Sequence, residues 1–245
     1  MLTLALFVAL AVAVTGWLLR EKASLLGKGM MVVGAVVCFG IVGWRFMETV
    51  GPSAGAGPDR GQAVVSYFLA NQAMGELASR QGTVVMFFPP ESIMDEEAVG
   101  TFAGTFGRVL RGLPGIKLEV VTLEVPDKVA KTGQIPLAAF QSAAAKHSGV
   151  IACVSFAGVP ADVGDFKVAA SERQPVFFVF DPWGSTQWLE PLKKGMVRAV
   201  VVPRPGVRHN AGDEISGEPG AVFSQLYLMA TPANAAQIAG QLGAQ

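Results

Sequence analysis

Apolar and polar residues follow a different pattern at the N-terminus from that in the rest of the chain. Residues 2–19 and 29–44 form two runs without a charged side chain. At 1.5 Å of rise per residue, the first run makes a helix of about 27 Å, close to the thickness of a bilayer's hydrocarbon core. The short charged segment between the runs forces the two helices to be antiparallel neighbours. The pattern therefore predicts a transmembrane helical hairpin over residues 1–46.

A cleaved signal peptide is the alternative interpretation of the first run, because Ala9-Leu10-Ala11 resembles a cleavage site. No basic residue precedes the run and a second apolar run follows it, which favours an anchor. Arg20, Lys22 and Lys28 lie in the connecting segment, and the positive-inside rule places them in the cytoplasm. We expect a two-pass inner-membrane (cytoplasmic-membrane) protein whose termini and soluble domain are periplasmic.

Beyond a Gly/Pro-rich linker over residues 47–61, helical and strand periods alternate through a soluble domain at residues 62–245. Helical periodicity covers residues 62–80, 92–111, 137–146, 185–194 and 233–242, and residues 159–173 are ambiguous. Apolar, β-rich runs cover residues 83–88, 117–125, 150–156, 175–180, 197–202 and 222–230, and residues 206–220 form a polar loop. This order predicts the α/β class, as a doubly wound, mostly parallel, about six-stranded three-layer sandwich.

Residues 147–202 resemble one lobe of a type I periplasmic-binding-protein-like, Rossmann-like domain. The resemblance rests on two stretches, HSGVIACVSFAGVP and PVFFVFDPWGSTQWLEPLKKGMVRAVVV. In that family one strand ends in a small-residue turn, another carries a short loop, and a helix–Gly–strand unit closes the lobe. Because the family's two lobes need more residues than this chain has, the resemblance implies a single lobe.

Charge and motifs exclude several classes of function. Lys+Arg and Asp+Glu number 19 each, and the basic residues near the N-terminus leave the soluble part mildly acidic, which argues against a nucleic-acid partner. Cys38 and Cys153 fall in an apolar run and a predicted strand, so we expect no disulfide. Metal-ligand spacings, a dinucleotide-binding glycine fingerprint and a nucleophile elbow are absent from the sequence. We expect no metal, no cofactor and no enzymatic activity.

The carboxyl ends of the predicted strands carry the candidate binding residues. Ligands of open α/β sheets bind beyond these ends. The candidates combine carboxylates, hydroxyls, a small turn residue, an aromatic ring and a cation: Glu91, Ser92, Ser155, Gly158, Asp181, Trp183 and Arg204. Ser92 has a second interpretation as the cap of the following helix, and Ser155 as a strand residue bonded to the backbone.

Three hypotheses of function follow. The first is a non-enzymatic accessory or scaffold subunit, anchored in the lipid bilayer and bound to a membrane-protein partner or to further copies of itself. It rests on the hairpin and on stripes of small residues, such as Ala5, Ala9 and Ala13, that let helices approach closely. The second is a tethered small-molecule-binding or sensing module. The third, and weakest, is an enzyme that uses Glu91 or Asp181.

Overall fold

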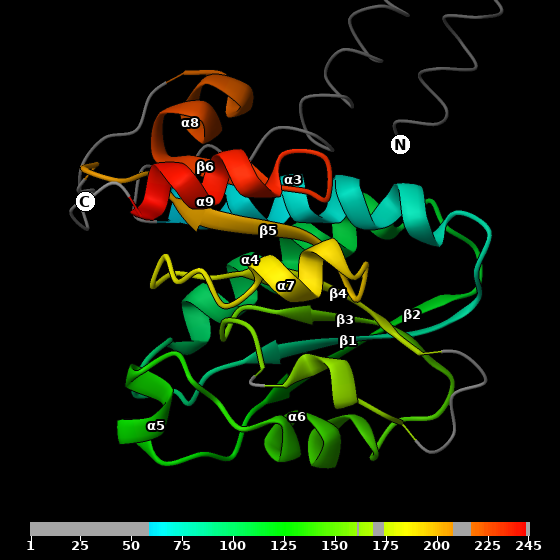
Figure 1. The fold of residues 1–245 in the computed structure, drawn as a ribbon. Helices are drawn as coiled ribbons and strands as arrows, with labels where there is room; N and C mark the ends of the chain where they lie inside the picture. The colour runs from blue at the N-terminus through cyan, green and yellow to red at the C-terminus, as the bar shows by residue number, and fades with distance from the viewer. Residues whose placement is uncertain (1–58, 161, 169–173, 208–216, 244–245) are drawn as a thin grey trace, which may run out of the picture. The chain divides into compact units, whose positions relative to one another are not determined.

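The computed structural model describes residues 59–160, 162–168, 174–207 and 217–243 (Figure 1). The chain divides into two compact units, residues 1–53 and 54–245, and the described residues all belong to the second. The predicted hairpin at residues 1–46 lies outside them, as does the predicted linker up to residue 58. Among the described helices, none combines the length and the apolar character needed to cross a membrane.

One six-stranded sheet forms the centre of the domain, with its strands in the order β2-β1-β3-β4-β5-β6. The strands are β1 (Gly82–Phe88), β2 (Ile116–Thr122), β3 (Val150–Ser155), β4 (Val176–Phe180), β5 (Val197–Pro203) and β6 (Tyr227–Ala230). The first five are parallel, and β6 is antiparallel to β5. This confirms the predicted α/β class and the six-stranded, mostly parallel sheet.

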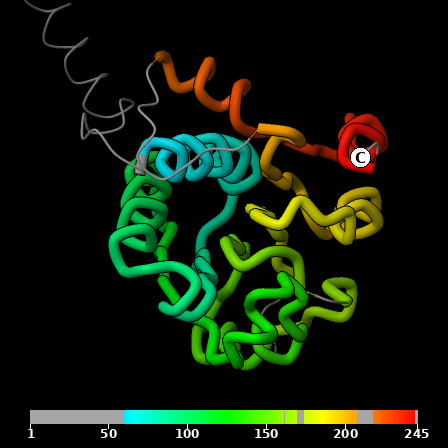
Figure 2. The backbone as a smooth tube through the Cα atoms, turned by 90° about the vertical axis from the view of Figure 1, so that its left-hand side faces the viewer, coloured from blue at the N-terminus to red at the C-terminus, as the bar shows by residue number. Residues whose placement is uncertain are grey.

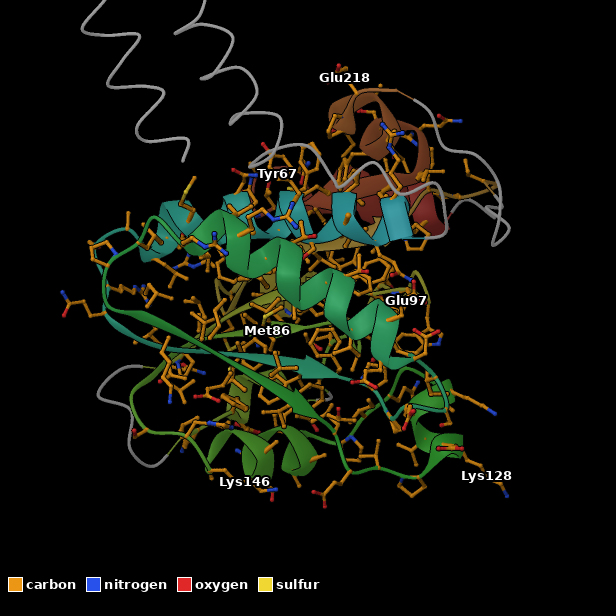
Figure 3. All side chains as sticks on the ribbon, turned by 180° about the vertical axis from the view of Figure 1, so that it is seen from behind. Tyr67, Met86, Glu97, Lys128, Lys146 and Glu218 are labelled. Carbon is orange, nitrogen blue, oxygen red and sulfur yellow. The ribbon has the colours of Figure 1, made fainter. Side chains whose placement is uncertain are left out.

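Three helices cover one face of the sheet: α3 (Asp59–Leu77), α4 (Glu96–Leu110) and α8 (Pro219–Leu226). Alternation along β1 turns Val84, Met86 and Phe88 to this face, where they join one hydrophobic core cluster with the three helices. Figure 3 shows α4 and α3 crossing this face, with Met86 beneath α4.

The opposite face carries α5 (Asp127–Lys131), α6 (Leu137–Ala144), the 3-10 helix η1 (Val163–Asp165), α7 (Leu189–Lys193) and α9 (Ala235–Gly243). Val85 and Phe87 turn to this face and pack in a second core cluster with Phe140 and Trp188. Figure 2, seen from the end to which the parallel strands point, shows α3 and α4 on one side and α7 and α9 on the other. The domain is therefore wound on both faces of its sheet.

The helix α8 corrects the prediction of a strand over residues 222–230. Buried Val222, Phe223 and Leu226 are spaced by one and four positions, which is a helical and not an alternating pattern. Pro219 stands in the first turn, where proline is well tolerated, and Phe223 stacks on Phe68 of α3 at 4.1 Å between ring centroids. Strand structure is confined to the last four residues of the predicted run, Tyr227–Ala230.

Four helix starts also differ from the sequence prediction. Helix α3 begins at Asp59, within the predicted linker, and not at residue 62, and α7 begins at Leu189 and not at residue 185. Helix α4 begins at Glu96 and not near residue 92, because Asp95 is its N-cap and accepts a hydrogen bond from the Ala98 amide at 2.8 Å. The last helix begins at Ala235 and not at residue 233. There the side chain of Asn234 accepts from the Thr231 amide at 2.7 Å and holds the chain in a preceding turn.

Candidate functional site

The loop after β4 is built around the side chain of Asp181. The residue is 1% exposed, and its carboxylate accepts hydrogen bonds from the Trp183 amide at 3.1 Å, the Ser185 amide at 2.8 Å and the Ser185 hydroxyl at 2.7 Å. Burial raises the pKa of Asp181 above its ordinary value of 3.8, although these hydrogen bonds oppose the shift. Asp181 therefore fixes the shape of the loop that carries Trp183.

The half-buried indole of Trp183 packs against two glycines from other connections of the sheet. A Cβ atom placed on Gly133 would lie 2.7 Å from ring atoms Cδ2 and Cε3, and one on Gly158 would lie 3.1 Å from Cζ3. Both glycines also have positive φ, +66° and +78°, which side chains rarely adopt. The ring thus joins the end of β4 to the end of β3 and to the connection between β2 and β3.

At the end of β3, the fully buried Ser155 stabilises the turn that presents Gly158. Its hydroxyl donates to the Gly158 carbonyl at 2.6 Å and accepts from the Ala157 amide at 3.2 Å. Both hydrogen bonds of this hydroxyl are made within the turn, as expected if Ser155 is a strand residue bonded to the backbone. The structure therefore brings Ser155, Gly158, Trp183 and Asp181 into one connected group.

The other predicted residues lie apart from this group. The Ser92 hydroxyl donates to Asp127 Oδ1 at 2.6 Å, which ties the loop after β1 to the start of α5, so Ser92 does not cap α4. Arg204 donates from Nη2 and Nε to the Ser224 carbonyl of α8, at 2.7 and 3.0 Å. Glu91 is exposed on the loop after β1. In the described part of the chain, no hydrogen bond or ion pair links these three residues to Trp183.

A cavity of about 570 Å³ lies between η1 and α7. Its polar lining consists of Gln134, Asp162, Asp165, Gln187, Glu190 and Lys194, and its apolar lining includes Pro160, Val163, Pro191 and Met196. Gln134 directly follows Gly133, and Pro160 lies two positions after Gly158. The two glycines that pack against the Trp183 ring are therefore one and two positions away from residues of the cavity wall.

Carboxylates outnumber cations in this lining. Glu190 is already paired, since Lys193 donates to its carboxylate at 2.9 Å, and that hydrogen bond together with the charges of Lys193 and Lys194 lowers its pKa. Asp162 adopts a left-handed conformation, with φ of +56°, at the start of η1. Together with the two glutamine amides, these groups both donate and accept hydrogen bonds, so they suit a ligand that carries hydroxyl or amino groups.

Little in the amino-acid sequence indicates this cavity. Its lining comes from residues 134, 160, 162–165 and 187–196, which are separate in the chain. The middle segment lies in the stretch whose periodicity was ambiguous, and amide side chains in loops are ordinarily solvated. One available signal was proximity to the strand ends, because the segments after β3 and β4 supply most of the lining.

Few side chains among the described residues are suited to bind a metal ion or to act as a nucleophile. They contain no cluster of three or more His, Cys, Asp or Glu side chains that would hold a metal ion. Cys153 is fully buried in β3, and burial raises the pKa of its thiol well above the ordinary value of 9.0. The thiol therefore stays protonated at neutral pH and is a poor nucleophile.

No protein-family model and no curated protein match the sequence. Similar solved structures include a solute-binding protein of an ABC transporter from Burkholderia graminis C4D1M in complex with D-arabinose. It is 17% identical, with a TM-score of 0.44, over 77% of this chain and 55% of that chain. A galactofuranose-binding protein is 10% identical, with a TM-score of 0.48, over 74% and 62% of the two chains. A sugar-binding protein of a sugar ABC transporter from Bacillus halodurans is 13% identical, with a TM-score of 0.43, over 76% and 68%.

By their names, these three structures are solute-binding and sugar-binding proteins. The chain spans 55–68% of their lengths. At these identities and TM-scores the similarity concerns the general fold and identifies no ligand for this chain.

Proposed function

We propose that this chain is a membrane-tethered binding module for a small polar molecule, and that it carries out no chemistry on that molecule. The cavity between η1 and α7 supports the proposal. Its volume of about 570 Å³ falls within the range of about 300–1,000 Å³ that ligand pockets occupy. Its wall combines apolar surface with six polar or charged side chains, which can form hydrogen bonds to a polar ligand.

The proposed ligand is rich in hydroxyl or amino groups. Gln134 and Gln187 each supply an amide oxygen and an NH₂ group, and Asp162 and Asp165 supply acceptors. Val163 and Met196 supply apolar surface for the carbon skeleton of the ligand. Each hydrogen bond to a neutral partner contributes about 0.5–1.5 kcal/mol, so several of them together select the ligand.

The loops beside the cavity are already held in place before a ligand arrives. Asp181 anchors the loop after β4 with three hydrogen bonds, and Trp183 packs on Gly133 and Gly158. A preformed wall reduces the conformational entropy that binding would otherwise cost. We therefore expect binding with little rearrangement of the strand-end loops.

A thermal-shift screen of the full chain in detergent micelles, with sugars, polyols and small amines as probes, tests this proposal. Any hit is then titrated against Gln187→Ala, for which we expect affinity to fall about tenfold, because one neutral hydrogen bond is lost. Gln225→Ala is the matched control, since Gln225 is exposed on α8, away from the cavity lining. Equal affinities of the two variants would reject the cavity as the site.

The proposal of a membrane tether is based on the two uncharged runs at residues 2–19 and 29–44. We propose that they anchor the chain in the inner membrane as a two-pass hairpin, with the binding domain on the periplasmic side. In membranes washed with alkaline carbonate, the full chain should stay in the pellet. Recovery of the intact chain in the wash would refute the anchor.

An accessory subunit is the second candidate function, and the small-residue stripe Ala5, Ala9 and Ala13 in the first run favours it. Such a stripe suits close packing on another membrane helix. This function predicts a membrane protein that co-purifies in fixed stoichiometry after gentle detergent extraction. Replacing Ala9 with Leu should then release that protein, while Leu10→Ala should not.

A further inference from the structure

The strand β2 forms one edge of the sheet (Figure 1). In the described part of the chain it pairs with β1 alone, in an uninterrupted parallel register from Ile116 to Thr122. The Leu123 amide donates to Phe88 of β1, and the Gly115 carbonyl accepts from Gly82, so odd-numbered residues direct their backbone groups toward β1. By alternation, the backbone N–H and C=O groups of Ile116, Leu118 and Val120 point outward.

The side chains of β2 give this edge an apolar face and a charged face. Ile116 and Leu118 pack partly against the core under α4, and Val120 on the same face is 48% exposed. On the other face Lys117 and Glu119 form an ion pair at 2.5 Å. Natural edge strands are commonly protected by bulges, prolines or unmatched lysines. Here the strand has no bulge and no proline, and its lysine is matched by a glutamate.

We propose that two copies of this chain associate through β2, paired antiparallel about a two-fold axis at Leu118. In this register the outward-facing backbone groups form the hydrogen-bonded pairs, with Ile116 opposite Val120 and Leu118 opposite Leu118. Lys117 of each copy lies opposite Glu119 of the other. Apolar residues therefore meet apolar residues, and each charge meets its opposite, on both sides of the axis.

Neighbouring registers match less well. An axis at Glu119 places the two Glu119 carboxylates directly opposite each other, which is destabilising. An axis at Val120 places Glu119 opposite the apolar Val121 and Lys117 opposite Leu123, which is 1% exposed. Charge complementarity thus selects the axis at Leu118, and the two six-stranded sheets become continuous. This association does not depend on a ligand in the cavity.

Charge reversal tests the pairing in the full chain. In detergent micelles, sedimentation velocity should show a dimer for the wild type, and a dissociation constant at least about tenfold higher for Glu119→Lys and for Lys117→Glu. An equimolar mixture of the two variants should recover the dimer, because lysines of one copy then face glutamates of the other. A monomeric wild type would overturn the proposal, and so would a dimer that is insensitive to either variant.

Cysteine cross-linking tests the register. In a Cys38→Ser background, Leu118→Cys should be captured as a covalent dimer by a short thiol-specific cross-linker, because the two residues meet at the axis. Thr122→Cys is the matched control: it also lies on the outer edge, but the two copies of residue 122 would be about 27 Å apart, eight residues at about 3.4 Å each. Equal cross-linking at both positions, or none at 118, would overturn the proposed register.

Discussion

At the scale of single residues, a position can require glycine for its backbone conformation or for lack of space. Gly133 and Gly149 allow these two reasons to be distinguished. Both have positive φ, +66° and +61°, but a Cβ atom on Gly133 would meet the Trp183 ring while one on Gly149 would meet nothing within 4 Å. Gly149→Ala should therefore cost only the strain of a left-handed side-chain residue, about 1–2 kcal/mol. Gly133→Ala should cost about 1–3 kcal/mol more, because the ring must move.

Denaturant unfolding of both variants, alone and with Trp183→Ala, measures these costs. The excess cost of Gly133→Ala should shrink in the Trp183→Ala background, since the two residues are in contact. Identical costs for the two glycine variants in the wild-type background would contradict the packing of Trp183 on Gly133.

Asp181 should make stability depend on pH. Because burial raises the pKa of Asp181 in the folded state above 3.8, the folded chain holds a proton that the unfolded chain has already released. The stabilising contribution is complete below pH 3.8 and is lost as pH rises through the folded-state pKa. The free energy of unfolding of the wild type, relative to Asp181→Asn, should therefore be constant below pH 3.8 and fall as the pH rises above it. A difference that rises or stays constant would contradict this role.

At the scale of elements, Asp95 should stabilise α4 as its N-cap. Removing the side-chain acceptor with Asp95→Ala should lower the free energy of unfolding by about 1 kcal/mol. Asp95→Asn keeps an acceptor oxygen and should stay within a few tenths of the wild type. Equal losses for the two variants, measured by denaturant unfolding, would show that the hydrogen bond to Ala98 does not determine the helix start.

The elements that the sequence predicted well are those whose own pattern determines them. The buried strands β1, β3, β4 and β5 are nearly continuous apolar runs, and α4 has a regular apolar stripe. The prediction failed at α8, whose short helix is stabilised by the contact of Phe223 with Phe68, far away in the sequence. It also failed at Asp95 and Asn234, where a single side chain sets the boundary.

At the scale of the whole molecule, the strand-end rule located part of the candidate site. Gly158, Asp181 and Trp183 come together because parallel strands end at one edge of the sheet. Arg204 follows a strand at the same edge but bonds to α8, on the face opposite to η1 and α7. Proximity to the strand ends indicated the region of the cavity but not its lining residues, because Gln134, Asp162 and Gln187 meet only after the connections fold back over the sheet.

Native mass spectrometry of the gently extracted full chain tests the central claim, that the cavity between η1 and α7 holds a small molecule. Gly164 lines this cavity, and a Cβ atom there would lie 3.3 Å from Met196 Cε, so Gly164→Phe should fill it. Gly104→Phe, on an exposed position of α4 with nothing within 4 Å, is the matched control. The account predicts an additional small-molecule mass on the wild type and on Gly104→Phe that is lost from Gly164→Phe. A wild type without such a mass, or a mass that survives in Gly164→Phe, would contradict it.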